Sequence, residues 1–256
     1  AGASFANLST FTYDYLAIDP LILDLNGDGV KLTSFAEAPV LFDIDHDGGS
    51  KEVTGWVSAQ DGILVRPGAN NIVDDISETF SEYFGGAVGS NGDAGTKMHA
   101  NGFAALKSLN TDNGNIGSAG YDDNAFTSAD NAWSSVKVWV DANHNGNTDA
   151  GELKSLTELG ISRINLTATA QSGLVNGGNE VLATGTFVQN GVTQQAQAAR
   201  FIANPTGNTA TDDATATTVS AQDGQSTYVS SVITGDTIDV TDKGVKNAYG
   251  NAGADT

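Results

Sequence analysis

The sequence predicts a loop-rich α+β fold. Short apolar runs of strand length, such as Leu21 to Leu23 and Ile63 to Val65, are separated by turns rich in Asp, Asn and Gly. Helical spacing of apolar residues covers only short windows, the clearest from Lys97 to Leu109. We therefore expect a domain of short strands and a few short helices, flanked by strand-forming segments at both ends of the chain.

The composition describes a globular and strongly acidic chain. Of its 256 residues 39 % are hydrophobic, and 31 acidic residues against 11 basic ones give a formal net charge of −20. Such a charge repels nucleic acid and anionic membranes and favours cations, so we expect no nucleic-acid partner. The chain has no cysteine, which excludes disulfides, zinc–thiolate sites and thiol nucleophiles. No apolar run reaches the roughly 18 to 20 residues of a membrane helix, so we expect no membrane insertion.

Residues 141–152 have the spacing of an EF-hand calcium loop, and we call this segment the long loop. Oxygen-bearing residues stand at loop positions 1, 3, 5, 7, 9 and 12, with a glycine at position 6. A hard divalent cation takes about six to eight oxygens, which a short loop supplies only if it turns sharply, as Gly146 permits. The alternative is an acidic surface turn that binds nothing. The predicted ligands are Asp141, Asn143, Asn145, Asn147, Asp149 and Glu152.

Two shorter acidic turns share one design, in which an apolar strand leads into three oxygen donors and a glycine. We call residues 24–29 the first turn and residues 43–48 the second turn. Neither has a glutamate at position 12, so each must borrow ligands, for which Glu37, Glu52 and Asp61 are candidates. Turn residues that cap their own backbone are the alternative. The predicted ligands of several calcium ions in this region are Asp24, Asn26, Asp28, Val30 at position 7, Asp43, Asp45, Asp47, Glu52 and Asp61.

The middle of the chain contains the expected helices. Residues 77–84 are compatible with a short helix that ends at two glycines, and residues 97–109 form the better helix despite Gly102. Residues 110–123 are an Asn/Asp/Gly-rich loop with a further possible ligand, Asp112. A third helix is expected from Ser128, and a fourth from Gly151 to Leu159.

The C-terminal part is strand-like. Residues 161–166 read as a strand, and residues 181–202 alternate around an Asn190-Gly191 hairpin turn. We divide the chain into an extended segment at 1–19, a calcium-binding and ligand-binding module at 20–203, and a linker with C-terminal strands at 204–256 that packs with the first segment.

Four stretches in this order resemble calcium-dependent modules of RTX proteins: Pro20 to Gly29, Thr54 to Val65, Val138 to Asn143 and Glu152 to Gly160. The resemblance covers about residues 13 to 203. It implies one of two functions. FrpC-type self-processing modules cleave an Asp-Pro bond when calcium binds and can leave the aspartyl group joined to a lysine. The peptide-binding domains of long RTX adhesins capture the C-terminus of a host surface protein.

The dipeptide Asp19-Pro20 stands where the self-processing family has its scissile bond. The resemblance implies that Asp19 would be the nucleophile and Pro20 the new N-terminus. The dipeptide has chemistry of its own, because an aspartate carboxyl can attack its own carbonyl while the tertiary nitrogen of proline leaves. The alternative is a strand that begins with proline.

The adhesin function ranks first on the sequence. Where self-processing modules carry further acidic repeats, this chain has Arg66 to Asn71, and it has a long insertion between Asn110 and Asp130. We therefore predict a calcium-dependent module of a secreted, cell-surface RTX adhesin that binds a peptide C-terminus and mediates attachment and biofilm formation. Its partner would be an extracellular peptide or a host cell-surface protein, and the module would be monomeric within a longer chain. Self-processing is the alternative, and then the only enzymatic activity expected.

Overall fold

The structure is a computed structural model of the 256-residue chain. It describes residues 16–34, 38, 40–48, 51–90, 94–111 and 124–204, together with four three-residue strands beyond residue 217. Residues 1–15, Glu37 and Asp112 lie outside the described residues, and so do the expectations that concern them.

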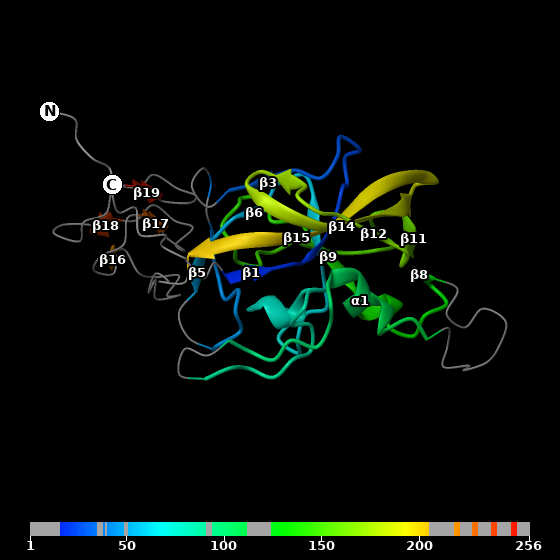
Figure 1. The fold of residues 1–256 in the computed structure, drawn as a ribbon, viewed down its shortest axis with the longest axis horizontal. Coiled ribbons are helices and arrows are strands. Elements are labelled where there is room, and N and C mark those ends of the chain that lie inside the picture. The colour runs from blue at the N-terminus through cyan, green and yellow to red at the C-terminus, as the bar shows by residue number, and fades with distance from the viewer. Residues whose placement is uncertain are drawn as a thin grey trace, which may run out of the picture.

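The described part is nearly all β, so the expected α+β class is wrong. Strands hold 38 % of the residues and helices 7 %. A 13-stranded sheet has the main order β10-β9-β7-β2-β15-β14-β11-β8 (Figure 1). The strands are β1 (Leu16–Ile18), β2 (Leu21–Leu23), β3 (Leu32–Thr33), β4 (Val40–Phe42), β5 (Glu52–Thr54), β6 (Trp56–Val57), β7 (Gly62–Val65), β8 (Ala125–Thr127), β9 (Lys137–Trp139), β10 (Leu153–Ser155), β11 (Ile161–Asn165), β12 (Thr169–Ala170), β13 (Val175–Asn176), β14 (Asn179–Gln189), β15 (Val192–Asn204), β16 (Thr218–Ser220), β17 (Thr227–Val229), β18 (Thr237–Asp239) and β19 (Asn247–Tyr249).

The hairpin of β14 and β15 organises the sheet, and Figure 1 shows it as the long yellow ribbon that crosses the molecule. Its turn is Asn190-Gly191, with φ of 50° and 78°, as a two-residue hairpin turn requires, so this prediction is confirmed. Along its other edge β15 pairs with β2 and then β1, and beyond the end of β14 its last residues pair with β5 on the β14 edge. The hairpin therefore aligns segments that are nearly 200 residues apart in the sequence.

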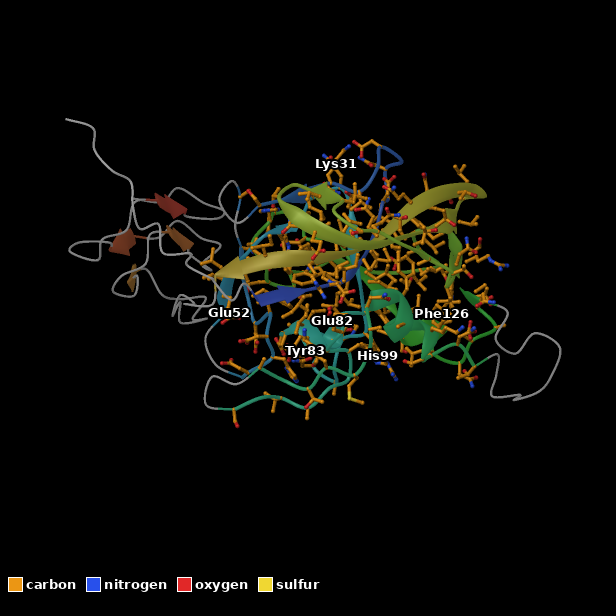
Figure 2. All side chains as sticks on the ribbon, in the orientation of Figure 1. Lys31, Glu52, Glu82, Tyr83, His99 and Phe126 are labelled. Carbon is orange, nitrogen blue, oxygen red and sulfur yellow. The ribbon has the colours of Figure 1, made fainter. Side chains whose placement is uncertain are left out.

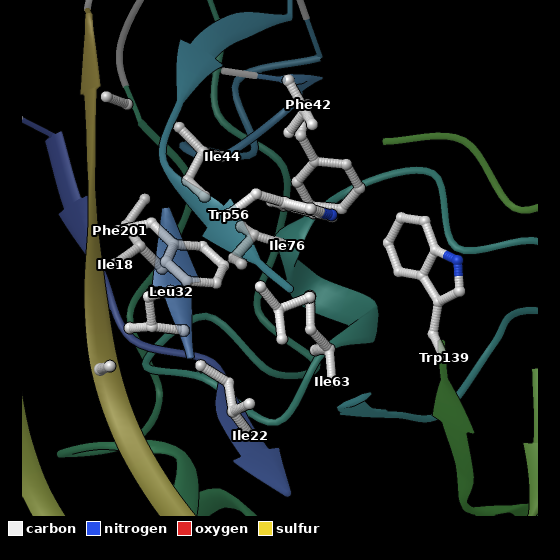
Figure 3. Close-up of a cluster of buried hydrophobic side chains, with 14 of the residues drawn as sticks. Ile18, Ile22, Leu32, Phe42, Ile44, Trp56, Ile63, Ile76, Trp139 and Phe201 are labelled. Atoms are coloured by element: carbon white, nitrogen blue, oxygen red, sulfur yellow. The ribbon is translucent and has the colours of Figure 1, made fainter. Parts of the chain in front are cut away.

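Both faces of the central strands are buried, which explains their unbroken apolar runs. Along β2 the side chain of Ile22 belongs to one core cluster, whereas Leu21 and Leu23 belong to the other. Figure 3 shows the first cluster, in which Trp56 packs between Phe42 and Phe201 at ring-centroid distances of 5.1 and 5.4 Å. Side chains alternate between the faces of a strand, so two cores require apolar residues at consecutive positions.

Helices are fewer and shorter than the sequence suggests. The expected helix at 97–109 is reduced to α1 (Gly102–Lys107), with Asn101 as its N-cap, and the expected helices near 77 and 128 are single 3-10 turns (Ile76–Glu78 and Trp133–Ser135). The expected helix at 151–159 is wrong. Leu153–Ser155 is the strand β10, because the long loop reverses the chain and pairs this segment with β9. Tertiary pairing has overridden local helical preference here.

The described strands of the C-terminal segment pair with one another, β16 with β18 and β17 with β19, in parallel. The expected pairing of this segment with the first residues of the chain lies outside the described residues, and the domain division stays a prediction. Among the described residues no helix is long and apolar enough to cross a membrane.

Candidate functional sites

The bond between Asp19 and Pro20 lies between β1 and β2, which pair with β15 in one antiparallel register. Ile18 pairs with Phe201 and Leu21 with Ala198, so the register sets Asp19 opposite Arg200 and Pro20 opposite Ala199. The backbone N–H of Ala199 donates to the carbonyl oxygen of Pro20 over 3.3 Å. Proline has no N–H to donate, so its nitrogen lies at an interruption of this ladder.

The carboxyl group of Asp19 is fully buried and held by two backbone amides. The N–H of Gly102 donates to Oδ2 over 2.8 Å and the N–H of Glu82 donates to Oδ1 over 3.3 Å. A side chain at position 102 would collide with the carbonyl oxygen of Phe80 and lie 2.9 Å from the backbone nitrogen of Leu21. Glycine is therefore what lets α1 approach the start of β2, directly after Asp19 and Pro20.

Burial raises the pKa of Asp19 to about 8. Removal from water is the main cause, because it disfavours the charged form, and the negative charge of Glu82 acts in the same direction. The two amide hydrogen bonds and the positive charge of Arg200 lower the pKa but do not cancel the effect of burial. Burial thus favours the acid form of Asp19 near neutral pH.

Two of the charged groups near Asp19 pair with each other. The buried carboxylate of Glu82 lies 2.7 Å from Nζ of Lys97 and 3.2 Å from Nη2 of Arg200, and Nη1 of Arg200 lies 3.3 Å from the half-exposed Glu180. Figure 2 labels Glu82 and its neighbour Tyr83 on the segment that follows Ile76–Glu78.

The second turn and β5 bring three carboxylates together. One oxygen from each of Asp43, Asp45 and Glu52 lies within 4.8 Å of the others. Burial, and then the neighbouring carboxylates, raise the pKa of Asp43 to about 6 and that of Glu52 to about 9. Oδ1 of Asp43 is buried and has no hydrogen-bond partner in the described part of the chain. Converging, buried and incompletely paired oxygens fit a hard cation such as Ca²⁺.

Two further residues lie beside this cluster. The charge of Asp75 contributes to the raised pKa of Asp43, and Asp75 also lies 3.1 Å from Nδ1 of His46. No local pattern marks Asp75, which is 23 residues beyond Glu52 and outside any loop spacing. Asp47 is only half-buried.

In the first turn, Asp24 acts as the turn former. Its two carboxylate oxygens accept from the N–H groups of Gly27 and Gly29 over 2.8 and 2.9 Å. Asp61 accepts from the backbone of Lys31 through Oδ2, while its Oδ1 is buried without a described partner. Asn26 and Asp28 are exposed, and the carbonyl of Val30 accepts from Nδ2 of Asn176 over 2.7 Å.

The long loop closes around two buried carboxylates that already have donors. Asp141 accepts from the N–H groups of Asn145 and Gly146 over 3.1 and 2.8 Å and from Nε1 of Trp56 over 2.8 Å. Glu152 accepts from Ala142, Asp149 and Nε1 of Trp139 at 2.9 to 3.2 Å.

The remaining predicted ligands of the long loop bond to one another. Nδ2 of Asn143 and of Asn145 both donate to Oδ2 of Asp149, over 2.7 and 3.0 Å, and the backbone N–H of Asn147 donates to Oδ1 of Asn145 over 2.7 Å. The assignment of these residues as calcium ligands stays a prediction.

Sequence reasoning also missed the surroundings of Asp19. The pairing of β15 with β1 and β2 brings Arg200 opposite Asp19, and a tertiary contact brings Glu82 to it. No local sequence pattern marks either residue. Gly102 did give a signal, because a glycine in a helical pattern often indicates close packing, but it was interpreted only as a weakness of the helix.

These features define a β-rich domain with acidic turns suited to cations and a buried Asp-Pro dipeptide at its first sheet strands. A family model described as the SPM domain matches residues 21–202, and the chain belongs to that family. Over 177 residues the chain is 36 % identical to the iron-regulated protein FrpA of Neisseria meningitidis serogroup C. The aligned part is 68 % of this chain and 14 % of that protein. The expected relationship to FrpC-type modules is thus confirmed at the level of the family, and calcium dependence stays a prediction.

Proposed function

We propose that this domain cleaves its own chain between Asp19 and Pro20 when calcium binds. The observation that carries the proposal is the buried carboxyl of Asp19, which two backbone amides hold in place directly before a proline. An aspartate that merely precedes a strand has no need of such a setting, and burying an ionisable group costs folding free energy. The position of the dipeptide immediately before the residues matched by the family supports the same interpretation.

The chemistry needs only the atoms of this dipeptide and one water. A side-chain oxygen of Asp19 attacks the main-chain carbonyl carbon of Asp19, the bond from that carbon to the nitrogen of Pro20 breaks, and the carboxyl proton moves to the proline nitrogen. The products are a five-membered cyclic anhydride and a free proline amine. Water then opens the anhydride and leaves two carboxyl groups on Asp19. A protonated nucleophile suits this reaction, because it brings the proton that the leaving nitrogen requires.

The surrounding residues hold the reacting groups. Residues 80–84 contact both sides of the dipeptide. The carbonyl of Phe80 accepts a hydrogen bond from the N–H of Leu21 over 2.8 Å, and the N–H of Glu82 donates to Asp19. Pairing of β1 and β2 with β15 fixes the main chain on both sides of the bond. A carboxyl held next to its own carbonyl gains the advantage of an intramolecular reaction.

The second turn links a cation to this arrangement. Asp43, Asp45 and Glu52 would hold the ion, with Asp75 beside them. When bound, calcium supplies positive charge that offsets the repulsion among these carboxylates. The carbonyl of Asp43 accepts from the N–H of Ile76 over 3.0 Å, and Ile76 begins the segment that reaches Glu82. A calcium ion that fixes the conformation of the second turn would therefore also help to fix the segment that holds the carboxyl of Asp19.

We also propose that the protein that contains this domain is secreted, which the relationship to FrpA supports. Capture of a peptide C-terminus at the cell surface stays a prediction, which no observation in the described residues favours over cleavage.

The test is intact-mass spectrometry of the purified chain with graded calcium. We expect two fragments, residues 1–19 and residues 20–256, whose masses sum to that of the chain plus one water. Asp19→Ala should abolish the break and Pro20→Ala should slow it, whereas Glu158→Gln, an exposed change on another turn, is the control. A chain that stays intact at every calcium concentration overturns the proposal. Calcium-dependent binding of peptides with free but not amidated C-termini would then favour peptide capture.

A further inference from the structure

We propose that Glu82 is a positioning residue that holds Arg200 in an ion pair and so keeps the Asp19 carboxyl in its acid form, ready to pass its proton to the nitrogen of Pro20. This inference rests on the proposed cleavage and names residues that the sequence motifs do not include. The supporting observation is that the negative charge of Glu82 and the positive charge of Arg200 both lie near Asp19 and pair with each other.

Arg200 stands directly across the ladder from Asp19. In an antiparallel pair, residues in opposite positions project from the same face of the sheet. Arg200 therefore shares with Asp19 the face that α1 covers, since their neighbours Ala198 and Leu21 belong to the core cluster of that face. Glu180 is the next residue in the same row, opposite Arg200 on β14.

Glu82 reaches the same place from another part of the chain. Its backbone N–H donates to Asp19, and its backbone carbonyl accepts from the N–H groups of Met98 and His99 over 2.8 and 3.1 Å. Its side chain is 7 % exposed and paired with Arg200 and Lys97. The main chain and the carboxylate are thus both fixed, so the negative charge stays close to Asp19.

The two charges act on Asp19 in opposite directions. The charge of Glu82 raises the pKa of Asp19 and that of Arg200 lowers it, whereas burial, the largest cause, raises it to about 8. The carboxylate of Glu82 forms an ion pair with Arg200 and partly neutralises the guanidinium. The positive charge of Arg200 therefore lowers the pKa of Asp19 less than it would alone. The other titratable groups around Glu82 and Arg200 are Lys97, Tyr83, His99 and Glu180.

The experiment is the pH dependence of calcium-induced cleavage. For the native chain we expect the rate to fall on the alkaline side, as the acid form of Asp19 is lost above about pH 8. Glu82→Gln removes the buried partner of Arg200 and should move this fall to lower pH, and Arg200→Gln should move it to higher pH. A move by one pH unit changes the alkaline rate about tenfold. Glu180→Gln removes only the half-exposed partner of Arg200 and, because Glu82 still pairs with Arg200, should move the profile less than Glu82→Gln does.

Several outcomes overturn the inference. It fails if Glu82→Gln slows cleavage equally at every pH, as a merely structural role predicts, or if both variants move the fall in the same direction. If Glu82→Gln does not fold, the upward move of Arg200→Gln remains the deciding result. If the native chain does not cleave, the proposed function fails alone. Carbon-13 NMR titration of the Asp19 carboxyl then tests the inference, with the expected pKa order Arg200→Gln above native above Glu82→Gln.

Discussion

The second turn and the long loop contain the same kinds of residue, but their buried carboxylates differ in how many hydrogen bonds they accept. In the second turn, Asp43, Asp45 and Glu52 crowd together, and Oδ1 of Asp43 has no described partner. In the long loop, Asp141 and Glu152 each accept three hydrogen bonds, one of them from a core tryptophan. The second turn is short of positive charge, whereas the long loop is close to satisfied by its own N–H groups.

This difference separates two roles for acidic turns. The carboxylates of the second turn have few and long donors, such as the N–H groups of Ile44 and Asp47 at 3.2 and 3.3 Å, so at neutral pH a cation or protons hold this cluster together. A loop whose carboxylates accept amide and indole hydrogen bonds can keep its shape before an ion arrives. We infer that calcium has its greater structural effect at the second turn, and that the long loop is anchored to the core through Trp56 and Trp139.

The largest expected effect is that of calcium removal. At ten times its dissociation constant, calcium stabilises the folded state by about 1.4 kcal/mol for each site, or about 4 kcal/mol for three sites. In a domain of this size that corresponds to a fall in melting temperature of roughly 10 °C on chelation. Calorimetry with calcium or EDTA measures it, with magnesium as the control. An unchanged melting temperature would mean that both turns are stable without metal.

The second effect is that of pH on the calcium-free domain. The pKa values of Asp19, Asp43 and Glu52 are raised to about 8, 6 and 9, so the folded state binds more protons than the unfolded state from about pH 4 upward. Stability should therefore fall as pH rises through this window, by roughly 3 kcal/mol over two pH units for one such carboxyl. Urea unfolding in EDTA at several pH values measures this slope. Stability that rises with pH would contradict the expectation.

A smaller loss is expected when the long loop is detached from the core. Trp56→Phe keeps an aromatic ring but removes the indole N–H that donates to the buried Asp141 over 2.8 Å. A hydrogen bond to a charged group contributes about 1.5 to 3 kcal/mol. Trp133→Phe is the matched control, because its indole makes a long, exposed contact of 3.4 Å with Thr157. Equal free energies of unfolding for the two variants would show that Trp56 does not anchor the loop.

The smallest expected effect is a change in the free energy of unfolding that has opposite signs for the same substitution in the two sites. In calcium-free protein, Glu52→Gln replaces a buried carboxyl, which must take up a proton on folding, by a neutral amide and should raise stability at neutral pH by about 1 kcal/mol. Glu152→Gln weakens an acceptor of three N–H groups and should lower stability by a similar amount. Both changes should weaken calcium binding, as calorimetric titration can measure. Stability changes of the same sign would remove the distinction between the two sites.

Local features of the fold followed from the sequence, and pairings did not. The Asn190-Gly191 turn and the strand near 161–165 were predicted because turn chemistry and alternation are written in neighbouring residues. The strand at Leu153–Ser155 was interpreted as a helix, because only its pairing with β9 makes it a strand. The α+β class failed for the same reason, since segments of helical pattern were drawn into sheet or short turns.

The sequence by itself determined the acidic turns, the Asp19-Pro20 dipeptide and the relationship to a family, because each depends on residues close together in the chain. Only the tertiary structure decided that Asp19 is buried, that Arg200 faces it across the ladder, and that Glu82 and Gly102 hold its carboxyl. These contacts join positions 63 to 181 residues apart, counted from Asp19. Burial and opposing charge, which set the chemistry of a carboxyl group, exist only once distant segments have packed together.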